Sequence, residues 1–199
     1  MSQASESERS SGVVTQDTVD EFVGNAHGNL PRVQELLRSH PSLLRARARW
    51  DEDALGAAAH AGSRPVAEFL LAEGAPLDLP TAAMLGRVDD VEAYLSQDPA
   101  AANGSGAHGL SILYHAAAGG SIPVAALLLA NDVNVNTGSG ANTALHAAAS
   151  KGNAEMARWL LDRGADPGAL DYEGKTPLQI AEESGHEELT ELLRRSRAG

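Results

Sequence analysis

The sequence predicts an all-α solenoid, a stack of helix-turn-helix units joined by short β-hairpin or loop fingers. A glycine ends an alanine-rich run six times along the chain, at Gly28, Gly62, Gly86, Gly120, Gly152 and Gly185. Four of the five spacings are 32 to 34 residues, and the fifth is 24. An amphipathic run with paired apolar residues follows each glycine. A fixed period of this length indicates a repeat architecture, in which stacking supplies the core that no single unit can bury.

The two helices expected in each unit differ in bulk. The first is lined with alanine, as in LGAAAHAG at 55–62, and so allows its neighbours to approach closely. The second carries Leu, Phe, Tyr or Trp, as in MARWLL at 156–161. Thin inner helices and bulky outer helices should make the stack curve, with a concave face on the alanine side. We expect the glycine between them to adopt the left-handed conformation that ends a helix.

The spacing also predicts where the units begin and end. We expect a disordered tail at 1–17, followed by units at roughly 18–47, 48–76, 77–103, 104–136, 137–169 and 170–195, in a repeat domain that runs to 199. The short step between Gly62 and Gly86 loses its residues at 75–85, a segment that contains two prolines. The third unit should therefore lack its finger, which would leave a notch in the row of fingers.

Two segments near the C-terminus carry a recognisable pattern. NTALHAAASKGNAEMARWLLDRGADPGA at 142–169 and DYEGKTPLQIAEESGHEELTELL at 171–193 match G-x-T-P-L-H-x-A-A-x-x-G-H and L-L-x-x-G-A-D almost in register. The chain therefore resembles the ankyrin-repeat family over roughly 18–195. The resemblance implies that fingers and inner helices form a surface for a partner, and that the His146 ring hydrogen-bonds its own turn. Asp132 stands where the family has Gly, and Asp tolerates that backbone better than a β-branched residue.

Composition excludes several classes of protein. The chain has 43% hydrophobic residues, enough for a core, and no cysteine for disulfides or thiolate-bound metals. Its longest apolar runs are far short of the ~20 residues of a membrane span, and the N-terminal residues do not resemble a signal peptide. The net charge of −12 disfavours nucleic acid as a partner. We expect a cytoplasmic protein, without membrane contact, that is monomeric.

No arrangement of residues points to catalysis. The glycine-rich segments 103–109 and 136–142 lack the pattern of a phosphate-binding loop and coincide with expected fingers. No G-x-S-x-G elbow occurs between a strand and a helix, and acidic pairs fall on exposed helix faces. We therefore expect no enzyme activity, no catalytic residue, no cofactor and no bound metal. One alternative stays open, a small-ligand or metal sensor that uses the notch with His108 and His115.

The expected function is non-enzymatic recognition of a partner protein on the concave face, with Trp50, Tyr114 and Tyr172 as anchors. Met84 and Leu85 should form an exposed apolar spot beside the notch. The family's contact positions, carried over one by one with nearby polar groups, are Arg49, Trp50, Glu52, His60, Met84, Leu85, Ala107, His108, Leu110, Tyr114, His115, Ala118, Ser139, Asn142, Ser150, Lys151, Tyr172, Glu173, Lys175, Glu183 and Ser184.

Three arginines of the first units alternate along the chain. An extended finger would point Arg45, Arg47 and Arg49 to the same side, next to Trp50. Two interpretations remain open at this point. The arginines either belong to a solvated finger with Trp50 packed on the acidic second unit, or hold an acidic partner.

Overall fold

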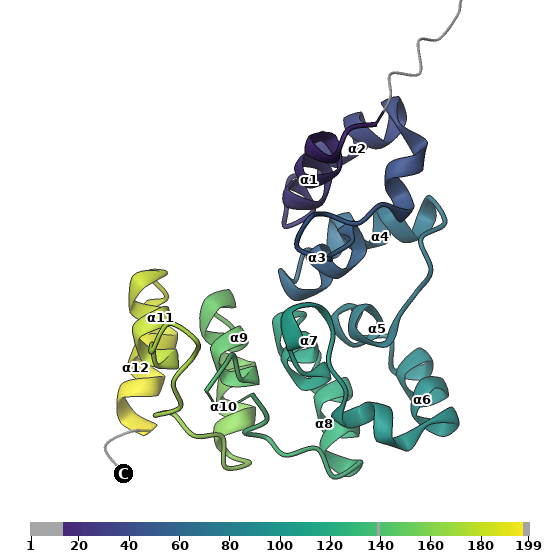
Figure 1. Ribbon diagram of the computed structural model, residues 1–199. Helices are drawn as coiled ribbons and strands as arrows, with labels where there is room; N and C mark the ends of the chain where they lie inside the picture. Colours follow the sequence, from purple (N-terminus) through teal and green to yellow (C-terminus); the bar gives the residue numbers. More distant parts are fainter. Residues whose placement is uncertain (1–13, 139, 197–199) are drawn as a thin grey trace, which may run out of the picture.

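The computed structural model describes residues 14–138 and 140–196, which fold into stacked pairs of short antiparallel helices (Figure 1). The inner helices are α1 (Gln16–Asn25), α3 (Ala54–His60), α5 (Leu79–Leu85), α7 (Ile112–Ala118), α9 (Ala144–Lys151) and α11 (Pro177–Glu183). The outer helices are α2 (Leu30–Ser39), α4 (Arg64–Ala72), α6 (Val88–Gln97), α8 (Ile122–Ala130), α10 (Ala154–Leu161) and α12 (Glu187–Ser196). Three short 3-10 helices complete the described chain, η1 (Pro41–Arg45), η2 (Pro99–Asn103) and η3 (Ala107–Gly109). The predicted all-α solenoid is confirmed.

The fingers are loops rather than hairpins. Over the described ranges the chain forms no β-strand, and two isolated antiparallel bridges, Arg47–Asp53 and Ser105–Ser111, stand in the second and fourth fingers. Each bridge lies where the chain enters an inner helix. The finger therefore holds the chain in place where the inner helix begins, without forming a β-ladder.

The first helix begins inside the segment expected to be a tail. Thr15 caps α1, because its hydroxyl oxygen accepts the Thr18 N–H at 3.2 Å, and the helix starts at Gln16, two residues before the expected first unit. Of the expected tail at 1–17, residues 1–13 lie outside the described part of the chain. The T-x-x-T cap explains the early start, because a side-chain oxygen satisfies a free N–H of the first turn.

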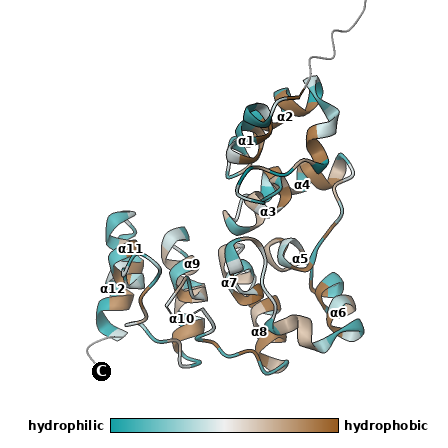
Figure 2. Ribbon diagram, viewed as in Figure 1, coloured by the Kyte–Doolittle hydropathy of each residue, from teal (hydrophilic) through white to brown (hydrophobic). Residues whose placement is uncertain are grey.

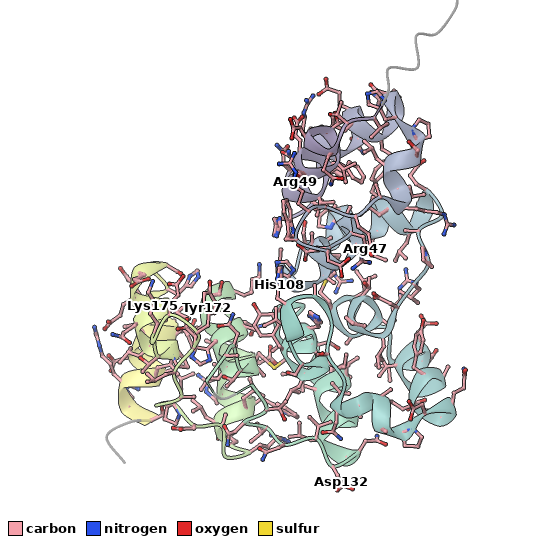
Figure 3. The ribbon with its side chains drawn as sticks, in the orientation of Figure 1. Arg47, Arg49, His108, Asp132, Tyr172 and Lys175 are labelled. Carbon is pink, nitrogen blue, oxygen red and sulfur yellow. The ribbon has the colours of Figure 1, made fainter. Side chains whose placement is uncertain are left out.

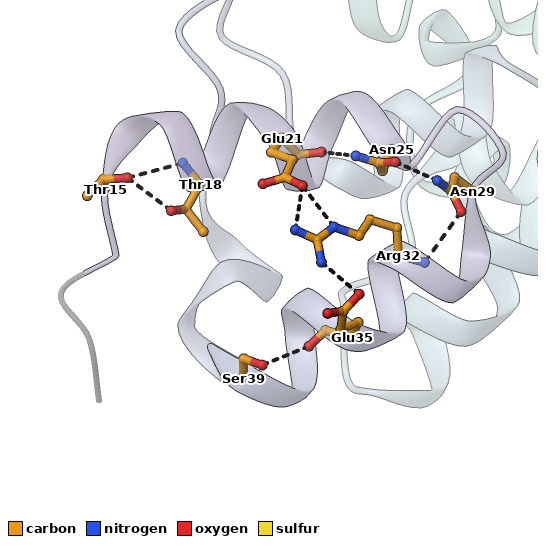
Figure 4. Close-up of polar contacts among 8 residues, drawn as sticks. All are labelled: Thr15, Thr18, Glu21, Asn25, Asn29, Arg32, Glu35 and Ser39. Atoms are coloured by element: carbon orange, nitrogen blue, oxygen red, sulfur yellow. Dashed lines mark hydrogen bonds and ion pairs between the residues drawn. The ribbon is translucent and has the colours of Figure 1, made fainter. Parts of the chain in front are cut away.

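The first pair of helices is tied together on its surface. The Arg32 guanidinium of α2 lies 2.6 Å from a carboxylate oxygen of Glu21 on α1 and 2.7 Å from one of Glu35 on its own helix (Figure 4). Beneath these ion pairs Phe22 and Val33 are fully buried. Surface ion pairs contribute at most about 1 kcal/mol, so the buried side chains carry most of the stability of this end.

Alanine allows the inner helices to pack closely. Each inner helix contacts the next along the stack, and the central alanines of α3, α5, α7 and α9 have no exposed surface. Bulkier side chains fill the space between inner and outer helices, such as Leu70, Leu128 and Leu160. The first and last inner helices, α1 and α11, present much hydrophilic surface (Figure 2).

The third unit lacks its finger, as the sequence predicts, but the expected notch is absent. Only residues 73–78 join α4 to α5. Helix α3 of the second unit contacts both α7 and η3 of the fourth, so the stack bends sharply and closes the gap on its inner side (Figure 1). Helices α4 and α6 lie apart on the outer side of the same bend. Removing a finger therefore shortens the inner side of the stack.

The bend buries the apolar spot that was expected beside the notch. Met84 has no exposed surface and Leu85 is 6% exposed, so their prediction as exposed contact residues is wrong. Both belong to the hydrophobic core of the first two units, whereas Leu79, Ala82 and Ala83 of the same helix belong to the core of the later units. Helix α5 is thus buried on two faces, since neighbouring units close over it from both sides.

The glycines between helices mostly adopt the expected conformation. Positive φ angles occur at five of the six, Gly62, Gly86, Gly120, Gly152 and Gly185, and Asp132 takes a φ of 61° in the fourth unit. Gly28 is the exception, and its prediction is wrong. Helix α1 ends earlier, at Asn25, and a turn closed by the Gly28 N–H on the Asn25 carbonyl at 3.2 Å leads into α2.

Candidate functional site

The candidate site lies on the inner side of the bend. Figure 3 shows Arg49, His108, Tyr172 and Lys175 along this side, whereas Asp132 lies at the opposite, outer edge. The finger of the fourth unit reaches the second unit here, because no third finger stands between them. Residues from the two arms of the bend therefore meet around His108.

A buried carboxylate organises this meeting point. Glu52, 3% exposed, directly precedes Asp53, the N-cap of α3. One of its oxygens accepts a hydrogen bond from Trp50 Nε1 at 2.8 Å and lies 3.3 Å from His108 Nε2. The other oxygen lies 2.8 Å from His60 Nδ1. Residues of the second and fourth units thus contact the same carboxylate, that of Glu52.

The surroundings keep the Glu52 carboxylate ionised. Burial alone would raise its pKa, but the contacts from His60 and Trp50 and the charges of His60 and His108 lower the pKa to about 2. A buried carboxylate in this state needs positive or donating groups around it. Trp50 and His108 approach one oxygen of Glu52, and His60 lies beside the other.

A third histidine extends the cluster to the first unit. His27, just after α1, places its Nε2 3.1 Å from Nε2 of His60 and its Nδ1 2.9 Å from the Gly24 carbonyl oxygen. The His27 and His60 ring centroids are 4.8 Å apart, and those of His60 and His108 are 4.9 Å apart. His27, Glu52, His60 and His108, which we call the histidine–glutamate cluster, connect units one, two and four.

A hollow continues from the cluster toward the C-terminal units. It has a volume of about 590 Å³ and is lined by His60, His108, Leu110, Tyr114, Ala141, Asn142 and Tyr172. A second hollow of about 240 Å³ shares Tyr114, Asn142 and Tyr172 and reaches Lys175 and Glu183. Tyr172 is 72% exposed, whereas Tyr114 is half-buried and burial raises the pKa of its phenol. The inner side therefore offers a concave surface with two aromatic walls.

The remaining predicted contact residues differ widely in exposure. Lining the hollows or exposed near them are Arg49, Trp50, His108, Asn142, Ser150, Lys151, Tyr172, Glu173, Lys175, Glu183 and Ser184, while His60, Ala107 and Tyr114 are half-buried. Glu52, Leu110 and Ala118 are buried but belong to inner-side elements. Ser139 lies outside the described residues.

His115 is not accessible to any ligand. Its side chain has no exposed surface, and a Cβ on Gly106 would lie 2.3 Å from its Nε2, so the fourth finger covers the ring. Burial, with a contribution from the charge of His60, lowers the His115 pKa to about 3. The expectation that His108 and His115 line one pocket is wrong, because the finger that carries His108 closes over His115.

The arginines of the first units are engaged within the chain. Arg45 ends the 3-10 helix η1 and so does not belong to an extended run with the other two. Arg47 pairs with Asp51 at 2.7 Å and with Asp53 at 3.2 Å. The expectation of three parallel arginines is therefore wrong.

Arg49 and Trp50 lie at the edge of the inner side. Arg49 pairs with Asp17 and, at 3.1 Å, with Asp20 of α1. Trp50 is 46% exposed although its ring nitrogen is hydrogen-bonded to Glu52. The guanidinium is thus partly neutralised, whereas the indole keeps much of its face free.

Two further residues serve the fold from this surface. His146 Nδ1 accepts the Thr143 N–H at 3.1 Å and its Nε2 lies 3.2 Å from the Lys175 carbonyl oxygen, which confirms the predicted turn contact. Lys151 donates to the Ala61 carbonyl oxygen, far away in sequence. Burial lowers the pKa of its ammonium group. Lys151 therefore connects α9 with α3 across the inner side of the bend.

Sequence reasoning missed His27, although the signal was present. His27 and His60 are 33 residues apart, one repeat period, and residues one period apart lie side by side in a solenoid. No such rule brings His108 to Glu52, because these residues are separated by a whole unit. Only the bend makes that contact.

Comparison with known proteins agrees with this architecture. Residues 128–181 match the family model of ankyrin repeats in many copies. Residues 128–181 thus carry ankyrin repeats. A potassium channel, AKT3 of Oryza sativa subsp. japonica, is 45% identical over 58 residues, which is 29% of this chain and 6% of that protein. An ARF GTPase-activating protein, GIT2 of Homo sapiens, is 48% identical over 52 residues, or 26% of this chain and 7% of that protein. The chain thus matches only a small fraction of the length of either relative.

One further property concerns membranes. Among the described residues, no helix combines the length and the apolar character needed to cross a bilayer.

Proposed function

We propose that this chain is a non-enzymatic module that binds a partner protein on the inner side of its bend. The observation that carries the proposal is the pair of exposed aromatic rings on this side, Trp50 and Tyr172, with the hollow of about 590 Å³ reaching from His108 to Tyr172. Large aromatic side chains supply much of the energy of protein interfaces, and hollows beside them accept anchoring groups. Ankyrin repeats in general serve protein–protein interaction, which agrees with the proposed function.

The stack suits recognition because it is already ordered. Inner helices with fully buried alanines hold the fingers in place, so binding would order few additional groups. The two tyrosines come from different units, Tyr114 from α7 and Tyr172 from the sixth finger, and both line the same hollow. A partner would bridge units four and six in one contact.

The charge of the inner side favours a basic partner. Arg47 and Arg49 each contact two aspartates of this chain, so an acidic partner would have to compete with them. Glu173 and Glu183 are exposed at the other end and share Lys175 between them. Because the chain has a net charge of −12, we propose a partner segment that carries Lys or Arg around an apolar anchor.

Affinity capture followed by a binding measurement tests the proposal. The intact chain, immobilised at one end, is exposed to native lysate, and the affinity of the captured protein is then compared between the wild type and Tyr172→Ala. We expect binding to weaken by about 1–2 kcal/mol, because an exposed anchor is lost without a change in the core. Arg158→Ala, on the outer helix α10, is the control and should leave affinity unchanged. Equal affinity for the wild type and Tyr172→Ala would contradict the proposed surface.

Trp50→Ala tests the other end of the surface. We expect it to weaken partner binding by more than ~1 kcal/mol. Because Trp50 also donates to buried Glu52, the melting temperature of the variant must be measured alongside. Unchanged affinity in a folded variant would remove Trp50 from the interface.

A further inference from the structure

The histidine–glutamate cluster has more short polar contacts than its own protons can satisfy. His27 Nδ1 faces the Gly24 carbonyl oxygen at 2.9 Å. A carbonyl oxygen only accepts hydrogen bonds, so the proton of the neutral His27 ring is on Nδ1 and its Nε2 presents a lone pair. That lone pair points toward Nε2 of His60, 3.1 Å away.

A neutral His60 ring cannot satisfy both of its short polar contacts. Its Nε2 faces His27 at 3.1 Å, and its Nδ1 lies 2.8 Å from a carboxylate oxygen of Glu52. A neutral imidazole carries one proton. If the proton is on Nδ1, two Nε2 lone pairs oppose each other, and if it is on Nε2, a lone pair opposes a carboxylate. The cluster therefore requires one additional cation.

Glu52 gives a second, independent indication of a cation. The carboxylate is 3% exposed, and its Oε1 has no aligned hydrogen-bond donor among the described residues, nor does Nδ1 of His60 have an aligned partner. An ionised oxygen that is buried without a donor is costly. Its other oxygen is already engaged by Trp50 and His108, so Oε1, which has only the misaligned His60 Nδ1 beside it, is the atom available to bind a cation.

We infer that His27, Glu52 and His60 bind a divalent transition-metal ion, with Zn²⁺ as the best match to the donor set. One ligand atom from each residue can be chosen so that all three lie within 4.8 Å of one another. A point between them is then at most about 2.8 Å from each atom, so zinc bonds of about 2.0–2.2 Å require the three side chains to move closer together. The 3.1 Å between the two Nε2 atoms is already close to the separation of about 3.3 Å between neighbouring ligands of a tetrahedral ion.

The surroundings of the site suit an ion with an open coordination position. Two imidazoles and one carboxylate form the donor set of many zinc sites whose fourth position holds water or a ligand. His60 also lines the hollow of about 590 Å³, so solvent or a partner group can reach the fourth position. The Gly24 carbonyl orients His27, as hydrogen bonds to the distal nitrogen of metal-binding histidines commonly do. The sequence alone led us to expect no metal, because it paired His108 with His115 instead.

Titration of the intact, tag-free chain with Zn²⁺ tests the inference. After removal of metals with a chelator, calorimetry at neutral pH should show one saturable site per chain, and the melting temperature should rise with Zn²⁺. His27→Gln, at an exposed position, should weaken Zn²⁺ binding at least tenfold, and Glu52→Gln should do the same. His40→Gln is the matched control, since it removes one histidine outside the cluster and should leave the affinity unchanged.

Two outcomes would overturn the inference. The first is a wild-type chain with no saturable Zn²⁺ site. The second is equal Zn²⁺ affinity for the wild type and His27→Gln. Co²⁺ gives a readout that folding defects do not imitate, because the visible absorption of a bound four-coordinate ion should appear in the wild type and in His40→Gln but not in His27→Gln.

Discussion

Replacing His115 with leucine is expected to remove about 2 kcal/mol of the protein's loss of stability between about pH 7.5 and pH 5. His115 lies on α7 with no exposed surface, and both ring nitrogens lack a hydrogen-bond partner among the described residues. Burial lowers its pKa from 6.5 to about 3, with a contribution from the charge of His60. In the folded protein the ring is therefore neutral throughout this pH range.

The sign and size of the effect follow from proton linkage. Below pH 6.5 the unfolded chain binds a proton at this histidine, whereas the folded chain binds it only near pH 3. Stability contributed by His115 is thus complete above pH 6.5 and falls as the pH drops toward 3. At pH 5 the pH lies 1.5 units below the unfolded pKa, which corresponds to a loss of about 2 kcal/mol at roughly 1.4 kcal/mol per unit. Glu52 adds little to this loss, because its pKa is lowered from 4.5 to about 2 on folding and its contribution to stability is lost only as the pH falls below about 4.5.

Urea unfolding at the two pH values measures this difference. The wild type and His115→Leu are compared in buffer with a chelator, so that metal binding does not contribute. We expect the wild type to lose about 2 kcal/mol more than the variant on acidification, with the same m value. At pH 7.5 the variant should be at least as stable as the wild type, because leucine removes two buried polar atoms without a partner. Parallel losses in both proteins would refute a buried, neutral His115.

Glycine substitutions test the packing of the inner helices. Gly119→Ala would place a Cβ 1.8 Å from the Met84 carbonyl oxygen, which forces α5 and α7 apart by about 1.2 Å and should cost about 3 kcal/mol or more in urea unfolding. Gly24→Ala, at the open C-terminal end of α1, is its control and should be neutral or stabilise by up to about 1 kcal/mol, so equal effects would contradict the close approach. Gly152→Val requires a β-branched residue at φ 65° with its Cβ 2.6 Å from His186 Nδ1, and the melting temperature should fall clearly. An unchanged melting temperature would show that this glycine has no conformational role.

The periodic pattern was sufficient to predict most of the fold. Each helix pair could be predicted from local signals. These signals are an alanine-rich run, a glycine or its substitute, and an amphipathic run, and all of them lie within one unit. Asp132 and the His146 turn contact followed from the same register, and the structure confirms both. Met84, Leu85 and His115 were assigned incorrectly because their burial depends on how units two, three and four close over one another.

The sequence by itself determined the class of fold, the order of its inner and outer helices and the loss of the third finger, since each of these depends on residues close together in the chain. Only the tertiary structure decided what that loss does. Without the third finger, close packing draws the fourth finger onto α3, and the stack bends instead of leaving a gap. The fourth finger covers His115, and the bend brings His108 to Glu52. Contacts between units two and four cannot be read from a repeat period, because the period specifies nearest neighbours and the bend joins units that are not adjacent.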